Sequence, residues 1–108
     1  MIARNVTMRL KANSVAEFTQ TLEKEIIPLL RKQKGFQDEI TMVVPGGFQA
    51  VGISLWDQKE NADAYNRDAY PEVLKALAKV LDGTPQVQTC EVANSTWHKL
   101  AASVAVAA

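Results

Sequence analysis

The sequence predicts an α+β fold, in which helices cover one face of an antiparallel sheet. Two stretches show the three- and four-residue apolar spacing of helices, and four others alternate as strands do. Gly46 and Gly47 lie between two of the strand patterns and allow a tight hairpin turn. The predicted order is therefore strand, helix, strand, strand, helix, strand.

The composition places limits on the function. The chain has 108 residues, from which we expect a single domain over 1–100 and a small apolar tail over 101–108. Acidic and basic residues balance at 12 each, which argues against nucleic acid as a partner. The one cysteine, Cys90, cannot form an internal disulfide, so a cytoplasmic location is expected. No apolar run approaches the roughly 20 residues that span a bilayer, so no membrane partner is expected.

The first half of the chain predicts a strand over 2–11 and a helix over 14–34. Ser14 is a good N-cap residue, and a glutamate three residues later completes a capping box. Pro28 lies inside the helical pattern and has no backbone N–H, so it predicts a bend. Gly35 is the expected end of the helix.

The middle of the chain predicts a hairpin. Residues 37–44 and 48–56 alternate as strands, and the Pro45–Gly47 turn joins them.

The last part predicts a helix in two segments and a final strand. Asp57 is the expected cap of the first segment, 58–68. Pro71 then divides the helical pattern and begins a second segment, 71–82. Residues 86–93 read as the fourth strand. This order is that of the ferredoxin-like fold.

Alternation within each strand predicts which residues share a face of the sheet. The face beneath the helices is predicted to contain Val6, Met8, Leu10, Ile40, Met42, Val44, Val51, Ile53 and Leu55. The opposite face is predicted to contain Asn5, Thr7, Arg9, Glu39, Thr41, Val43, Ala50, Gly52, Ser54 and Trp56. For the fourth strand two registers remain open, with either Val87, Thr89, Glu91 and Ala93 or Gln88, Cys90 and Val92 on this second face. Its small residues suit a second subunit packed over it, with a cavity between the two.

The helix segment EIIPLLRKQKGFQD and the passage SLWDQKENADAY, together with length and element order, resemble the antibiotic biosynthesis monooxygenase-like family. The resemblance covers about residues 2–100. It implies a dimeric α+β barrel, a homodimer whose subunits pack through their open sheet faces and hold small-molecule cavities. The family includes cofactor-independent oxygenases of phenolic polyketides, quinol oxygenases and haem-degrading enzymes.

Cofactor-independent oxygenation needs a dry pocket that holds a deprotonated phenol, with hydrogen-bond donors, an aromatic wall and a modest base. The resemblance implies that the catalytic candidates are Asn5, Arg9, Trp56 and Tyr65. The candidate ligand-binding residues are Thr41, Ser54, Tyr70 and His98.

The catalytic candidates and His98 also have structural interpretations. Asn5 can hydrogen-bond across a dimer interface, and Arg9 can pair with Glu39 or Glu91. Trp56 is typical of an anchor at an interface or strand end. His98, the only histidine, is typical of an exposed or structural residue.

Haem and metal cofactors are not expected. The haem-degrading branch uses an asparagine on the first strand, and a tryptophan and a histidine on the second helix. Asn5 matches the first, but Tyr65 and Lys75 stand where the other two are expected, and a protonated lysine is a poor haem ligand. The sequence also shows no metal-ligand spacing, phosphate loop or nucleophile elbow.

Two functions are therefore predicted. The first is a cofactor-independent monooxygenase-like protein that acts on or binds a small aromatic or apolar molecule. The second is a non-catalytic ligand-binding or structural homodimer. A cavity lined by Asn5, Trp56 and Tyr65 would favour the enzyme, and a sheet face filled by interdigitating side chains would favour the second function.

Overall fold

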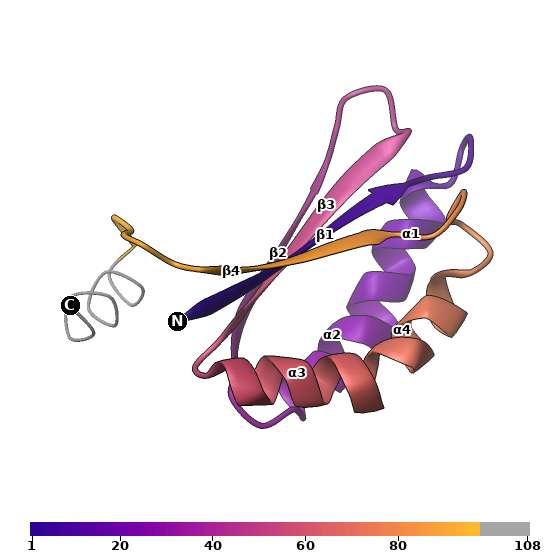
Figure 1. The fold of residues 1–108 in the computed structure, drawn as a ribbon. Coiled ribbons are helices and arrows are strands. Elements are labelled where there is room, and N and C mark those ends of the chain that lie inside the picture. The colour runs from indigo at the N-terminus through magenta and orange to yellow at the C-terminus, as the bar shows by residue number, and fades with distance from the viewer. Residues whose placement is uncertain (98–108) are drawn as a thin grey trace.

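A computed structural model describes residues 1–97 and shows a four-stranded antiparallel sheet with helices against one face (Figure 1). The elements are β1 Ile2–Arg9, α1 Val15–Thr21, the π-helix η1 Leu22–Ile26, α2 Ile27–Arg31, β2 Phe36–Val43, β3 Gln49–Trp56, α3 Lys59–Asp68, α4 Tyr70–Leu77 and β4 Gln86–Glu91. The strand order is β2-β3-β1-β4, which confirms the ferredoxin-like prediction. The predicted division at residue 100 and the tail over 101–108 lie outside the described residues, as does His98.

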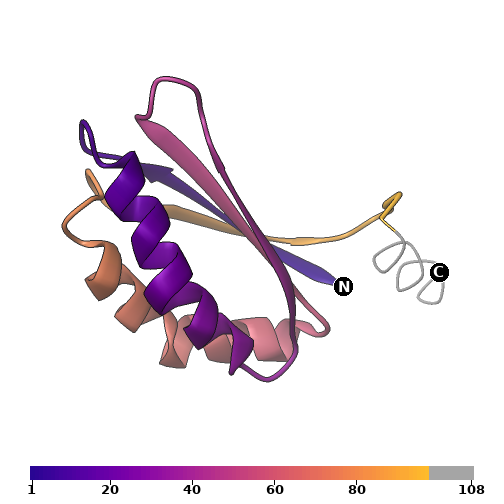
Figure 2. The ribbon, with the colours of Figure 1, turned by 180° about the vertical axis from the view of Figure 1, so that it is seen from behind.

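The first helical stretch is continuous from α1 to α2 (Figure 2). A π-helical segment, η1, lies directly before α2, at the place where Pro28 predicts a bend. Proline cannot donate the bond that would continue an α-helix to the Lys24 carbonyl, and a π-helical turn is one way to absorb the mismatch. The side chains of Leu22 and Ile26 project from this segment toward the sheet and line a cavity described below.

One of the two cap positions is confirmed. Ser14 is the N-cap residue of α1, but its hydroxyl makes no cap bond and instead donates to the carbonyl of Ala12 at 3.4 Å. The predicted cap at Asp57 is wrong by one residue. The residue before α3 is Gln58, and the Asp57 carboxylate accepts a hydrogen bond from the Asn61 side chain at 2.8 Å. The backbone N–H of Asp57 donates to Gly35, which holds this corner against the end of the first helical stretch.

The register of the sheet corrects the predicted faces of β2 and β3. Buried residues of β1 face the small residues of β3: Arg4 pairs with Ser54, and Met8 pairs with Ala50. Paired residues of an antiparallel sheet point to the same side. Ala50, Gly52, Ser54 and Trp56 therefore lie beneath the helices, and so do Glu39, Thr41 and Val43 of β2, which pair with Ser54, Gly52 and Ala50.

The face that the helices leave uncovered is more apolar than predicted; we call it the open face. It carries Ile40, Met42, Val51, Ile53 and Leu55 together with Ala3, Asn5, Thr7 and Arg9. The pairing also decides between the two registers predicted for β4. Gln88 pairs with Asn5 and Cys90 with Ala3, so these two residues lie on the open face, as the second register predicted. Ile40 and Met42 are 39% and 46% exposed on this face.

In the part of the chain that the structure describes, no helix is long and apolar enough to cross a membrane.

Candidate functional site

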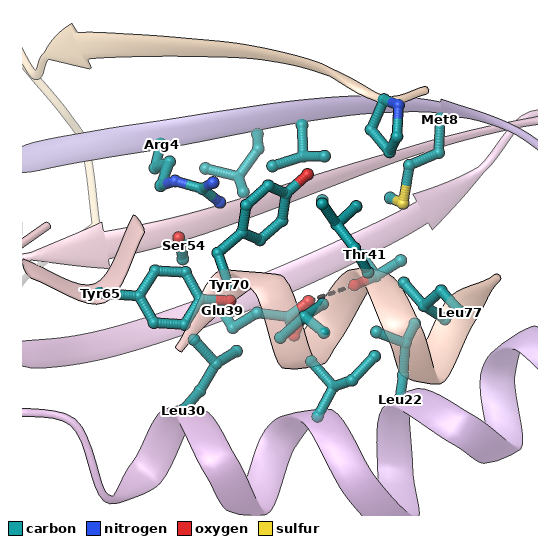
Figure 3. Close-up of a pocket in the computed structure, with 17 residues that line it drawn as sticks. Arg4, Met8, Leu22, Leu30, Glu39, Thr41, Ser54, Tyr65, Tyr70 and Leu77 are labelled. Carbon is teal, nitrogen blue, oxygen red and sulfur yellow. Dashed lines mark hydrogen bonds between the residues drawn. The ribbon is translucent and has the colours of Figure 1, made fainter. Parts of the chain in front are cut away.

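A small cavity lies between the covered face of the sheet and the helices. Its apolar wall comes from β1, η1, α2 and α4, and includes Val6, Met8, Leu22, Ile26, Leu30, Val73, Leu74 and Leu77. Its polar groups are Arg4, Glu39, Thr41, Ser54, Tyr65 and Tyr70 (Figure 3). An apolar wall with few polar groups is typical of a small-molecule site.

The volume of the cavity is about 60 Å³. A cavity of roughly 150 Å³ admits benzene in an engineered protein, so a ring-sized ligand needs some of the wall to move. Met8 is the most adaptable wall residue, because an unbranched thioether side chain repacks easily. Among aromatic ligands, one with a single ring therefore needs the least rearrangement of the wall.

Arg4 is the charged side chain most deeply buried at the cavity, with 3% of its surface exposed. Its Nη2 donates a hydrogen bond of 2.7 Å to Oδ1 of Asn66. The guanidinium carbon lies 4.0 Å from the centre of the Tyr70 ring and 5.1 Å from that of Tyr65. These distances are typical of cation–π contacts, which hold the cation without neutralising it.

An aromatic row leads from the end of the sheet to this arginine. The ring of Trp56 packs edge-on against Phe36 at 5.6 Å and lies tilted against Tyr65 at 5.0 Å. Tyr65 in turn lies 6.2 Å from Tyr70. Trp56 is fully buried, and its indole N–H donates to the Ser54 hydroxyl at 2.9 Å. The row thus fixes the two tyrosine rings beside Arg4.

Both tyrosines remain protonated at neutral pH. Burial raises the pKa of Tyr65 to about 12, although the nearby Arg4 opposes the shift. Burial also raises the pKa of Tyr70, again against the effect of Arg4. Each hydroxyl is therefore a hydrogen-bond donor and not a base near neutral pH.

Within residues 1–97, the hydroxyl of Tyr70 is the one buried side-chain polar atom that makes no hydrogen bond of ordinary length and angle, although Arg4 lies close enough to lower its pKa. The ring stands beside the Arg4 guanidinium (Figure 3).

Glu39 supplies the carboxylate of the cavity. It accepts a hydrogen bond from the hydroxyl of Thr41, two residues along β2. Among the described residues, neither Arg4 nor Glu39 takes part in an ion pair. The site therefore combines an uncompensated cation, a partly buried carboxylate and two phenolic donors.

The structure brings together four of the residues predicted from the sequence: Thr41, Ser54, Tyr65 and Tyr70 all line the cavity. Trp56 is part of the buried core, and it supports Tyr65 rather than lining the cavity.

Asn5 and Arg9 lie on the open face, away from the cavity residues of β1. The side-chain amide of Asn5 contacts the sulfur of Cys90 at 3.5 Å. Arg9 is exposed opposite Gln49, and within residues 1–97 it forms no ion pair with Glu39 or Glu91. The catalytic roles predicted for Asn5 and Arg9 would therefore need a site on the other side of the sheet.

Sequence reasoning missed Arg4 and the inward orientation of Glu39. One signal was present for Arg4, because it is two residues before Val6 and so falls on the apolar face of its strand. A charged residue at such a position is a candidate for a buried, functional group.

Lys75, which stands where the haem-degrading branch has its histidine, is not part of the cavity. Its amine is exposed on α4 and lies 3.8 Å from the carboxylate of Glu72. Among the described residues, no group of three or more potential ligands is arranged to hold a metal ion.

Comparison with solved structures shows which proteins share this fold. A monooxygenase of Streptomyces coelicolor, solved with the ligand nanaomycin D, superposes with a TM-score of 0.74 at 14% identity, over 87% of this chain and 88% of its own. SnoaB, a cofactor-independent oxygenase of Streptomyces nogalater, superposes with a TM-score of 0.72 at 13% identity, over 90% and 97%.

A third similar structure, from Bordetella bronchiseptica, is assigned by name to the antibiotic biosynthesis monooxygenases. It superposes with a TM-score of 0.72 at 15% identity, over 84% of this chain and 95% of its own. No protein-family model matches the sequence, and no curated protein matches it. At the level of fold the resemblance is confirmed: the chain has the ferredoxin-like α+β fold of the antibiotic biosynthesis monooxygenases.

Proposed function

We propose that this chain is a cofactor-independent monooxygenase-like protein whose substrate is a small phenol or quinol bound in the cavity. The observation that carries the proposal is an apolar cavity with Arg4, Glu39, Tyr65 and Tyr70 around it, in a fold that cofactor-independent oxygenases share. The small volume favours a single ring over a polycyclic substrate.

The chemistry assigns a role to each polar group. Glu39 is the carboxylate placed to accept a proton from the substrate. Tyr65 and Tyr70 donate hydrogen bonds to a substrate oxygen, where charge develops as the proton leaves. The resulting carbanion transfers an electron to dioxygen. One oxygen atom enters the product, and the other leaves as water with two hydrogens from the substrate.

We further propose that the chain forms a homodimer through the open face. The half-exposed apolar residues Ile40 and Met42 support this interface, because an uncovered apolar sheet face favours association. In this arrangement Asn5 and Arg9 are interface residues. A cytoplasmic location remains a prediction from the single cysteine.

Oxygen consumption with a panel of quinols, phenols and anthrones tests the activity. Single-ring quinols are expected to be consumed faster than anthrones, and labelled dioxygen should place one labelled atom in the product. Tyr65→Phe should lower kcat by about 10-fold or more, because one donor to the developing oxyanion is lost. Lys75→Met is the matched control, since its amine is exposed on α4.

A blocking variant tests the location of the site. A Cβ at Gly52 would lie 3.5 Å from the methyl group of Met8 and 3.9 Å from the Thr41 hydroxyl, which is ordinary contact. Gly52→Val should therefore fold while its side chain occupies the cavity, and activity should be lost. Full activity in Gly52→Val would place the reaction elsewhere, whereas ligand binding without oxygen uptake by any substrate would favour the non-catalytic binding protein.

A further inference from the structure

We propose that Arg4 and Tyr70 form a receptor for an anionic oxygen, so that the cavity binds its phenolic ligand as the phenolate. The inference rests on the proposed function, because it names the ionisation state of the molecule held in the same cavity. It also applies to a protein that binds such a ligand without oxidising it.

The first support is the charge of Arg4. Its side chain is almost fully buried, and its neighbours within residues 1–97 are all neutral: the amide of Asn66, the faces of two tyrosine rings and the hydroxyl of Tyr70. Burying a guanidinium without a counter-ion is unfavourable, and an anion that enters beside it removes that penalty. A guanidinium has more N–H donors than the one Asn66 engages, so it can bind a further oxygen.

The second support is the hydroxyl of Tyr70. It is buried and makes no hydrogen bond of ordinary length and angle in the described part of the chain, although Arg4 beside its ring lies close enough to lower its pKa. An unpaired buried hydroxyl lowers stability, and an acceptor oxygen supplied by a ligand would satisfy it. Arg4 and Tyr70 extend into the same space from β1 and α4 (Figure 3).

The apolar and phenolic groups around this pair favour an anion whose body is aromatic, whereas the carboxylate of Glu39 opposes the charge of the anion. Tyr65 is the other phenolic donor, and Glu39 is the one carboxylate in the cavity lining of the described chain. Glu39 accepts its hydrogen bond from Thr41, and no ion pair joins it to Arg4. The remaining wall is apolar. The phenolic proton passes to the solvent buffer or to Glu39, and no other bond changes.

The test compares 4-nitrophenol with its methyl ether, 4-nitroanisole, which has the same ring but cannot ionise. Equilibrium binding of both is measured across pH, and the nitrophenolate absorbance reports the ionisation of the bound phenol. An opposite charge at contact distance lowers a pKa by about one to three units. At a pH near the probe's own pKa, the phenolate should therefore bind about tenfold more tightly than the ether.

Variants assign this preference to the two residues. Arg4→Met removes the charge and should abolish the preference for the phenolate. Arg67→Met is the matched control, because this arginine of α3 is exposed and paired with Asp68. Tyr70→Phe removes a hydroxyl that makes no hydrogen bond of ordinary length and angle, so the variant should fold, and the preference should fall about three- to tenfold.

The outcomes separate the inference from the proposed function. If the ether binds as tightly as the phenolate, or if the preference persists in Arg4→Met, the receptor is disproved while the cavity remains the ligand site. If neither compound binds to the wild-type protein, both proposals fail. Should Arg4→Met not fold, the wild-type preference and Tyr70→Phe still decide the question.

Discussion

Tyr65 occupies the centre of the site and connects the buried core with the cavity. Its ring packs against Trp56 on one side and lies near Arg4 on the other, while its hydroxyl faces the cavity groups. This position explains why burial dominates its ionisation.

The raised pKa of Tyr65 predicts how stability depends on alkaline pH. The pKa of Tyr65 has its ordinary value of 10.0 in the unfolded chain and is raised to about 12 in the folded protein. The contribution of this pKa difference to the free energy of unfolding is therefore complete below pH 10. It amounts to about 2–3 kcal/mol and is lost between about pH 10 and 12. Urea unfolding across this range should show a shallower loss of stability for Tyr65→Phe than for wild type. Tyr70, whose pKa is also raised, continues to titrate in the variant. Identical pH profiles for the two proteins would contradict the assignment.

The turn between α2 and β2 fixes the helices against the sheet. Gly35 has a φ of +82°, and its carbonyl accepts a hydrogen bond from the backbone of Asp57 at the end of β3. A Cβ on Gly35 would overlap the side chains of Asp57 and Asn61. The corner therefore requires glycine both for its conformation and for its space.

Gly35→Ala should destabilise the fold by about 2–5 kcal/mol, the sum of a positive φ and the steric overlap. Gly83→Ala provides the control, since Gly83 has a φ of +88° but nothing within 4 Å of an added Cβ. It should cost only about 1–2 kcal/mol. Chemical denaturation of both variants measures the difference, and equal losses would show that the contact with Asp57 and Asn61 is unimportant.

The whole molecule has one face covered by helices and one left open. The covered face encloses the cavity, while the open face presents apolar side chains from β2 and β3. The two proposed activities of the molecule, ligand binding and self-association, thus belong to opposite sides of a single sheet.

The dimer proposal predicts that Met42→Lys weakens self-association. Burying a lysine in an apolar interface carries a desolvation penalty, so the dissociation constant of the dimer should rise by about 10-fold or more. Sedimentation over a range of concentrations measures this change. Ala78→Lys is the control, because it adds the same charge at an exposed position just after α4. A monomeric wild-type protein, or equal association of both variants, would refute the open-face interface.

The sequence by itself determined the order and approximate extent of the helices and strands. Alternation, helical spacing and the Gly46–Gly47 turn are local properties, and they led directly to the ferredoxin-like fold. Four cavity residues were also predicted from the sequence and its family resemblance: Thr41, Ser54, Tyr65 and Tyr70.

Only the tertiary structure decided which face of each strand is covered. Alternation shows which residues of a strand share a face, but it does not show which face the helices cover. In this sheet the more apolar face of β2 and β3 is the open one. The small residues Gly52 and Ser54 lie beneath the helices, where they leave space for the cavity. The same arrangement turns Arg4 inward, where it contacts two tyrosines of α3 and α4 that are far from it in the sequence. No local pattern encodes such a contact.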